Sequence, residues 1–181
     1  ACVGARDLKD DQIKICEDLG MWLVSNNHMV HSGNALGADQ AYARGANSVR
    51  PKYVYLELPW KHYEERAIHP DNSIMSIEEH SKEAQDHYLG LACANHPAWE
   101  RLGPGAQKLM MRNVAILQPF YDFALEGSVS VDVVIAFPGN RPGGGGTGHT
   151  MRVANYFGIR VVDISKFDKD QLFDLAEEFR S

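Results

Sequence analysis

The fold is decided by the stretch over residues 131–150, VDVVIAFPGNRPGGGGTGHT. Its first seven residues are almost all apolar and rich in β-branched side chains, which is typical of a central parallel strand covered on both faces. Four successive glycines then lead to Thr147, which can cap a helix over 147–157. The stretch therefore predicts a buried strand that passes through a glycine-rich turn into a helix.

The same alternation of strand and helix continues on both sides of this stretch. The N-terminus reads as a strand that ends near Gly4, and the following patterns predict strands at 28–31, 53–58 and 158–164 and helices at 10–26, 38–47, 74–95, 105–118 and 168–179. Residues 60–72 read as a loop. We expect a single α/β domain over 1–181, a Rossmann-like doubly wound, mainly parallel sheet of about five or more strands with helices on both faces.

Composition sets further bounds. A chain of 181 residues with 44% hydrophobic and 23% charged residues has the ordinary composition of a globular protein, which excludes disorder. The formal charge of −6 disfavours binding to nucleic acid. The three cysteines and eight histidines lack metal-ligand spacing. We expect no metal, no cofactor, no membrane segment and a cytoplasmic location.

Three predicted strand exits carry glycine. Ligands of open parallel sheets bind outside the carboxyl ends of the strands, where helix N-termini attract anions. Glycine lets the backbone come close to such a ligand. We therefore predict that phosphate is bound by Gly4 and Arg6; by Ser32, Gly33, Gly37 and Asp39; and by Gly143, Gly144, Gly145, Gly146 and Thr147. The alternatives are a flexible surface turn at the glycine run, a solvated Arg6, and an Asp39 that only favours its helix dipole.

Two aromatic segments leave alternatives open. Trp60, His62 and Tyr63 follow a predicted strand, so they either form a wall for a base or pack the loop against the next helix. The apolar residues of 120–125 are either core or a subunit contact.

Four motifs in order resemble those of the SLOG superfamily, which includes LOG-type phosphoribohydrolases, DprA proteins and YpsA-related proteins. They are GAR at 4–6, SGNALGAD at 32–39, MRNVAIL at 111–117 and PGGGGT at 142–147. LOG enzymes cleave a nucleotide's N-glycosidic bond with an Arg and with the Glu of a PGGxGTxxE pattern. The resemblance implies that Arg112 is this Arg, with Asn113 in place of the usual Lys. The Glu position falls on Thr150, beside His149.

This departure decides the order of the hypotheses, because a missing carboxylate leaves nothing at that position to stabilise an oxocarbenium-like sugar. The leading hypothesis is a protein that binds a nucleotide or nucleotide-like small molecule, with Arg112 and Asn113 among the binding residues. The first alternative is a LOG-like N-glycosidase that uses Arg112 and His149 as catalytic residues. The second is DprA-like binding of single-stranded DNA. The resemblance also implies a homodimer or higher homo-oligomer, with 74–118 as the candidate interface.

Overall fold

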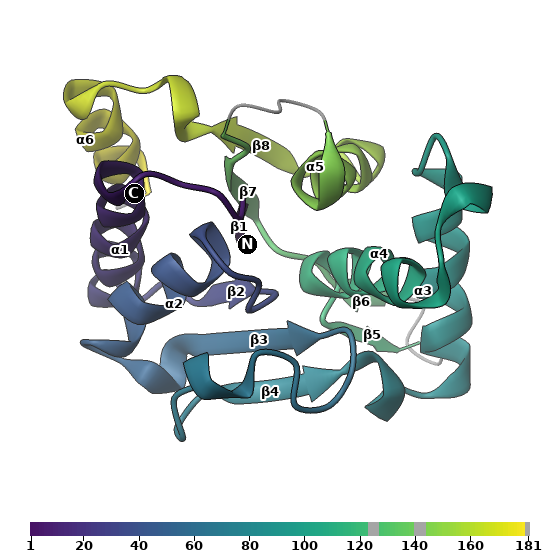
Figure 1. The fold of residues 1–181 in the computed structure, drawn as a ribbon. Helices are drawn as coiled ribbons and strands as arrows, with labels where there is room; N and C mark the ends of the chain where they lie inside the picture. The colour runs from purple at the N-terminus through teal and green to yellow at the C-terminus, as the bar shows by residue number, and fades with distance from the viewer. Residues whose placement is uncertain (123–126, 140–143, 180–181) are drawn as a thin grey trace.

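Strands and helices alternate along the chain in the computed structural model, which describes residues 1–122, 127–139 and 144–179 (Figure 1). The helices are α1 (Asp10–Ser25), α2 (Ala38–Asn47), α3 (Lys82–Ala94), α4 (Pro104–Leu117), α5 (Gly145–Tyr156) and α6 (Lys169–Glu178). The strands are β1 (Cys2–Gly4), β2 (Val30–Ser32), β3 (Val54–Leu58), β4 (Ser73–Ser76), β5 (Phe120–Asp122), β6 (Gly127–Val129), β7 (Val133–Phe137) and β8 (Arg160–Asp163). The α/β class is confirmed.

Local sequence explains where several helices begin. The Ser81 hydroxyl caps α3 by accepting a hydrogen bond from the Ala84 amide at 3.2 Å. Pro104 stands at the first position of α4, where its missing N–H costs nothing. Asp168 and Gln171 form a reciprocal capping box at the start of α6.

The parallel strands form two sheets of three strands each, in the orders β1-β7-β8 and β2-β3-β4. The prediction of one sheet of five or more strands is therefore not what the structure has. β1 and β2 are neighbours, but the contact between them is a side-chain one: the Ser32 hydroxyl donates to the Cys2 carbonyl at 2.7 Å. Strands β1 and β2 are the edge strands of their sheets and are not paired with each other by a backbone ladder. The Ser32 hydroxyl therefore joins the two sheets at these edges.

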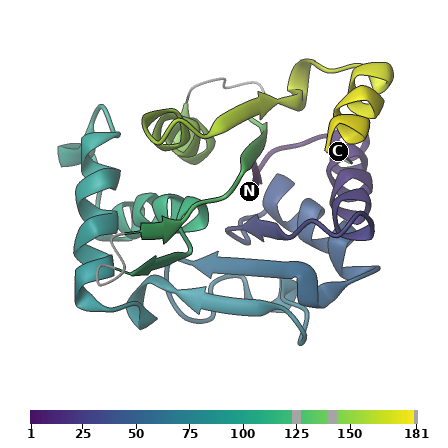
Figure 2. The same ribbon diagram turned by 180° about the vertical axis from the view of Figure 1, so that it is seen from behind.

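Helices cover both faces of the strands. Figures 1 and 2 show α1, α2 and α6 on one side of the strands and α3, α4 and α5 on the other. Successive residues of β7 point to opposite faces, so Ile135 and Phe137 pack in one hydrophobic core and Val134 and Ala136 in the other. The first core also contains Leu56 of β3, so it spans both sheets.

Two parts of the chain form strands that were not predicted. Residues 74–76, which we expected in a helix, belong to the edge strand β4, whose neighbour β3 supplies the pairing that sequence periodicity cannot reveal. Residues 120–122 and 127–129 form an antiparallel pair, β5 and β6, where no strand was predicted. The core-or-interface hypothesis for 120–125 falls partly on residues 123–126, which lie outside the described residues.

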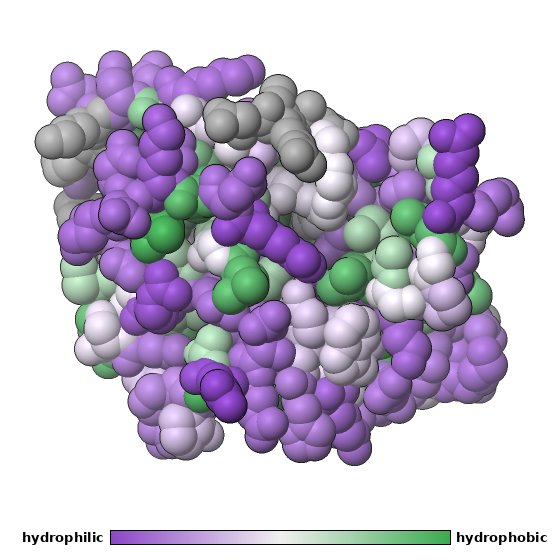
Figure 3. All heavy atoms as spheres, in the orientation of Figure 1, coloured by the Kyte–Doolittle hydropathy of each residue, from purple (hydrophilic) through white to green (hydrophobic). Residues whose placement is uncertain are grey.

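The surface shown in Figure 3 is mostly hydrophilic, with small separate hydrophobic patches. Exposed large apolar side chains come singly from different elements, for example Met21 of α1, Ile74 of β4 and Tyr156 of α5. No helix in the described part of the chain is long and apolar enough to cross a membrane. The predicted subunit interface at 74–118 stays a prediction.

Candidate functional site

A cavity of about 340 Å³ opens where β1 and β7 end and α5 begins. Four segments that are far apart in the sequence line it. They are residues 3–7 at the end of β1; Ala35 and Asp39 around the start of α2; Leu109, Met110, Arg112 and Asn113 of α4; and Pro138 with Gly144, Gly145, Gly146, Thr147 and Thr150 around the start of α5.

The start of α5 brings helix amides to the cavity. The first hydrogen bond of the helix runs from the Gly148 amide to the Gly144 carbonyl at 3.1 Å, so the amides just before Gly148 have no partner within the helix. These N–H groups and the helix dipole place a partial positive charge at the cavity. The helix begins two residues earlier than predicted, with Gly144 as N-cap, so the expected capping role of Thr147 is wrong.

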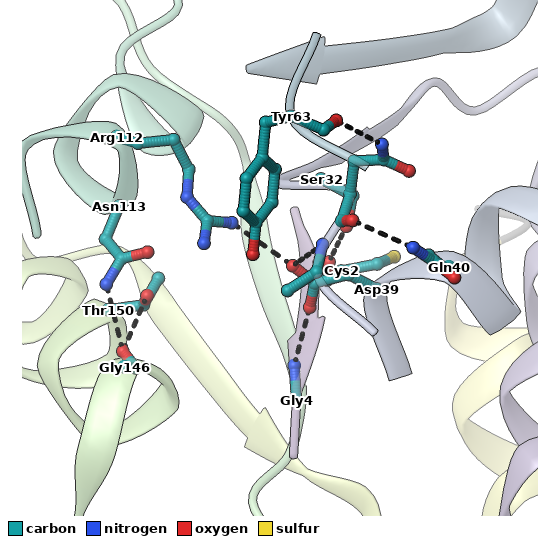
Figure 4. A network of polar contacts seen from close by, with 12 residues as sticks. Cys2, Gly4, Ser32, Asp39, Gln40, Tyr63, Arg112, Asn113, Gly146 and Thr150 are labelled. Carbon is teal, nitrogen blue, oxygen red and sulfur yellow. Dashed lines mark hydrogen bonds and ion pairs between the residues drawn. The ribbon is translucent and has the colours of Figure 1, made fainter. Parts of the chain in front are cut away.

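Two side chains tie this helix start to its surroundings. The Asn113 side-chain amide donates to the Gly146 carbonyl at 3.2 Å, and the Thr150 hydroxyl donates to the same carbonyl at 3.1 Å (Figure 4). The first contact joins α4 to α5, and the second lies within α5. Asn113 therefore lines the cavity, where it holds the glycine-rich backbone, and its predicted ligand contact stays a prediction.

A buried ion pair forms the opposite wall. The Arg112 Nη1 donates to the Asp39 Oδ2 at 3.2 Å, and both residues are at least 95% buried. The amides of Gly4 and Ala35 also donate to the Asp39 carboxylate, at 3.1 and 3.4 Å. Burial raises the pKa of Asp39 above its ordinary value, while the Arg112 charge and the two amides act against this increase.

Only one edge of the Arg112 guanidinium is used by this pair. Its Nε is buried and has no hydrogen-bond partner in the described part of the chain. Figure 4 shows the guanidinium between Asp39 on one side and Asn113, Thr150 and Gly146 on the other. A buried polar group without a partner costs free energy, so the Nε is a strained feature of this wall.

Three residues of the second glycine motif do not line the cavity, namely Ser32, Gly33 and Gly37. Ser32 is fully buried and bonds to Cys2, and Gly33 and Gly37 are also absent from the cavity wall. Gly33 has a different role, because a Cβ at this position would lie 1.2 Å from the Arg112 Nη1. Gly37 has a φ of +85° and precedes α2. The structure thus gives no support to phosphate contact by these three residues; Gly33 leaves space for the guanidinium instead.

His149 lies behind the cavity rather than in it. Its side chain is fully buried, its Nε2 donates to the Ala92 carbonyl at 3.1 Å, and its Nδ1 lies 3.4 Å from the Asn113 amide nitrogen. Burial lowers the pKa of His149 to about 4. The proposal that His149 acts as a catalytic base has no support from this position, because both ring nitrogens contact the protein interior.

Arg6 lies at the opening of the cavity. It is exposed, and its Nη2 donates to the Tyr63 hydroxyl at 3.3 Å. Tyr63 in turn makes an edge-to-face contact with Trp60, with ring centroids 5.2 Å apart. Neither Trp60, His62 nor Tyr63 lines the cavity, which favours the packing alternative for this segment. Gly143 lies outside the described residues.

Sequence reasoning missed the apolar wall and a buried polar network. Leu109 and Met110 line the cavity from α4, and nothing in a helical pattern marks which turn faces a ligand. Glu57 is fully buried and accepts hydrogen bonds from Tyr55 at 2.9 Å and His80 at 2.8 Å. Glu57 does not line the cavity. A charged residue inside the apolar strand 53–58 is the signal that could have indicated such a network.

In comparisons with known proteins, no family model, curated protein or solved structure matches the chain. Within the described ranges, no group of three or more His, Cys, Asp or Glu side chains is placed to hold a metal ion.

Proposed function

We propose that this protein binds a nucleotide or nucleotide-like small molecule, with the ligand's phosphate at the start of α5 and within reach of Arg112. One observation carries the proposal. Amides at the glycine-rich start of α5, which have no partner within the helix, and the buried guanidinium of Arg112 line the same cavity. Both groups require an acceptor, and a phosphate oxygen is the acceptor that suits both.

The rest of the cavity supports a small ligand of this kind. Its volume of about 340 Å³ is near the lower end of ligand pockets, which span about 300–1,000 Å³. Leu109 and Met110 offer an apolar surface to a base or sugar. Arg6 at the opening adds a positive charge that can attract an anion. The ordered motifs that resemble the SLOG superfamily support the same reading, and membership in it is part of the proposal.

The cavity favours binding over hydrolysis. Among the described residues, the carboxylates that line it are Asp7 and Asp39, and Asp39 is already engaged by Arg112 and two backbone amides. The Thr150 hydroxyl at the LOG-type glutamate position donates within its own helix. N-glycosidic cleavage and binding of single-stranded DNA are therefore the alternatives that an experiment must separate.

The test is thermal unfolding with the four ribonucleoside 5′-monophosphates, followed by chromatography of the ligand. We expect at least one nucleotide to raise Tm and to be recovered intact, and Gly146→Asp, which places a negative charge at the helix start, to remove the effect. Recovery of free base would establish the N-glycosidase instead. Binding of an oligonucleotide that weakens steeply with salt would establish the DNA alternative. If no nucleotide raises Tm, the proposal is wrong.

A further inference from the structure

We propose that Asp39 is a positioning residue: it holds the Arg112 guanidinium so that the unpartnered edge faces the start of α5, and it does not contact the ligand itself. This inference rests on the proposed function, because it names the residue that prepares Arg112 for an anion. It also changes the role of Asp39, which the sequence had placed among the phosphate-binding residues.

The hydrogen bonds of Asp39 are the first step of the argument. One carboxylate oxygen accepts from the Gly4 amide and the other from the Ala35 amide and from Arg112. These donors belong to the end of β1, the loop before α2, and α4. The carboxylate is therefore fixed by two backbone segments before it meets the guanidinium, and it is only 3% exposed.

The space around Arg112 is the second step. With no side chain at Gly33, the Nη1 lies where a Cβ would otherwise be, which brings the guanidinium against the chain next to β2. The planar fork of an arginine that is held at one edge presents its other nitrogens in a fixed direction. In Figure 4 that direction is toward the side on which Asn113, Thr150 and Gly146 lie, at the start of α5.

The inference is testable because a positioning role and a simple charge effect predict opposite changes in ligand affinity when the Asp39 charge is removed. A carboxylate close to a phosphate site repels the ligand, so removing its charge should strengthen binding if position does not matter. If Asp39 positions Arg112, then Asp39→Asn should weaken binding, because a neutral amide has one acceptor oxygen for the three donors and no charge to hold the guanidinium.

The experiment measures the Kd of adenosine 5′-monophosphate and of inorganic phosphate by calorimetry for the wild type, Asp39→Asn, Arg112→Met and the double variant. We expect Asp39→Asn to raise Kd at least tenfold in the wild-type background and to have no such effect in the Arg112→Met background. A tenfold loss in both backgrounds would mean a merely structural role and would overturn the proposal. Unchanged or tighter binding by Asp39→Asn would overturn it as well.

Asp7→Asn is the matched control, because Asp7 is an exposed carboxylate on the same cavity that does not bond to Arg112. It is expected to tighten binding slightly through loss of a negative charge. Melting curves of each variant show whether it folds, and Asp39→Glu, which keeps the charge, should recover part of the affinity if Asp39→Asn does not fold.

A measurement without ligand separates this inference from the proposed function. The Arg112 Nε–H resonance, assigned with Arg112→Met, should report a guanidinium with restricted rotation in the wild type and a freely rotating one in Asp39→Asn. If the wild type binds neither probe, the proposed function fails, and the resonance alone decides the role of Asp39. A resonance that Asp39→Asn leaves unchanged would refute the positioning role.

Discussion

At the scale of single residues, the site depends on side chains that the protein holds for one another. Asn113 fixes the Gly146 carbonyl, Asp39 fixes Arg112, and Gly33 provides the space that this guanidinium occupies. Residue type alone suggested that each of them contacts a ligand. The structure shows two different roles. Gly33 leaves space for the Arg112 guanidinium, whereas Asp39 and Asn113 hold groups that line the cavity.

Gly33→Ala tests this separation. The added Cβ would overlap the Arg112 Nη1, which must then leave the buried Asp39 carboxylate. We expect a loss of about 2 kcal/mol in the free energy of unfolding, measured with urea, together with weaker nucleotide binding. The control is Gly90→Ala in α3, where a Cβ meets nothing within 4 Å and a gain of about 0.5–1 kcal/mol is expected. Equal stability of Gly33→Ala and the wild type would contradict the close packing.

The lowered pKa of His149 predicts that the free energy of unfolding falls at acidic pH. A histidine whose folded pKa of about 4 lies below its ordinary value of 6.5 contributes stability that is fully present above pH 6.5 and is lost as the pH falls toward 4. At pH 5 this loss is about 2 kcal/mol relative to pH 7.5. His149→Gln should lose less stability over this range in urea unfolding. His31, whose pKa burial also lowers to about 4, titrates in both proteins and cancels in the comparison.

At the scale of elements, the start of α5 combines two kinds of glycine. Gly145 has a φ of +59°, in the region that disfavours other residues, whereas Gly146 does not have a positive φ and its Cβ would make an ordinary 3.7 Å contact with the Asn113 amide nitrogen. Glycine is therefore required for its backbone conformation at Gly145, while Gly146 contributes an amide next to the cavity and a carbonyl that accepts from Asn113 and Thr150.

This difference predicts opposite effects of the same substitution. Gly145→Ala should lower the free energy of unfolding by about 1 kcal/mol, because alanine is strained at positive φ. Gly146→Ala should leave it unchanged or raise it by up to about 1 kcal/mol, because alanine is favoured inside a helix. Thermal unfolding of the two variants side by side gives the result. A larger loss for Gly146→Ala would show that the helix start is different from the one described.

At the scale of the whole molecule, the two three-stranded sheets share one hydrophobic core. Leu56 of one sheet and Ile135 of the other belong to the same hydrophobic core, and the Ser32 hydroxyl joins their edges at Cys2. A shared core couples the unfolding of both sheets. We therefore expect circular dichroism and tryptophan fluorescence to give coincident unfolding transitions.

Ser32→Ala tests the junction between the sheets. Removing the buried hydroxyl takes away the hydrogen bond to the Cys2 carbonyl and should cost about 1–3 kcal/mol, with the transitions from both probes shifted together. Ser25→Ala is the matched control, since its exposed hydroxyl also donates to a carbonyl, that of Met21, at 2.8 Å. Its expected effect is within about 0.5 kcal/mol. Transitions that separate in Ser32→Ala would mean that the sheets unfold independently.

The alternation of strands and helices and the positions of the glycine-rich turns could be predicted from the sequence. Apolar runs such as 131–137 and helical spacing such as that of 10–26 are local signals, because burial imposes its period on neighbouring residues. The local signal was weaker at β4, whose strand form depends on pairing with β3. It was also weaker at Thr147, because the helix begins at Gly145 and Gly144 is its N-cap.

The sequence by itself determined the α/β class and that a glycine-rich segment lies between a central strand and a helix, because composition and period act over a few residues. Only the tertiary structure decided which polar groups meet. It brought Asp39 to Arg112 across 73 positions of the chain and directed His149 to the Ala92 carbonyl across 57. It also divided the parallel strands into two sheets. Such contacts depend on how elements pack, and packing is set by side chains distant in the sequence.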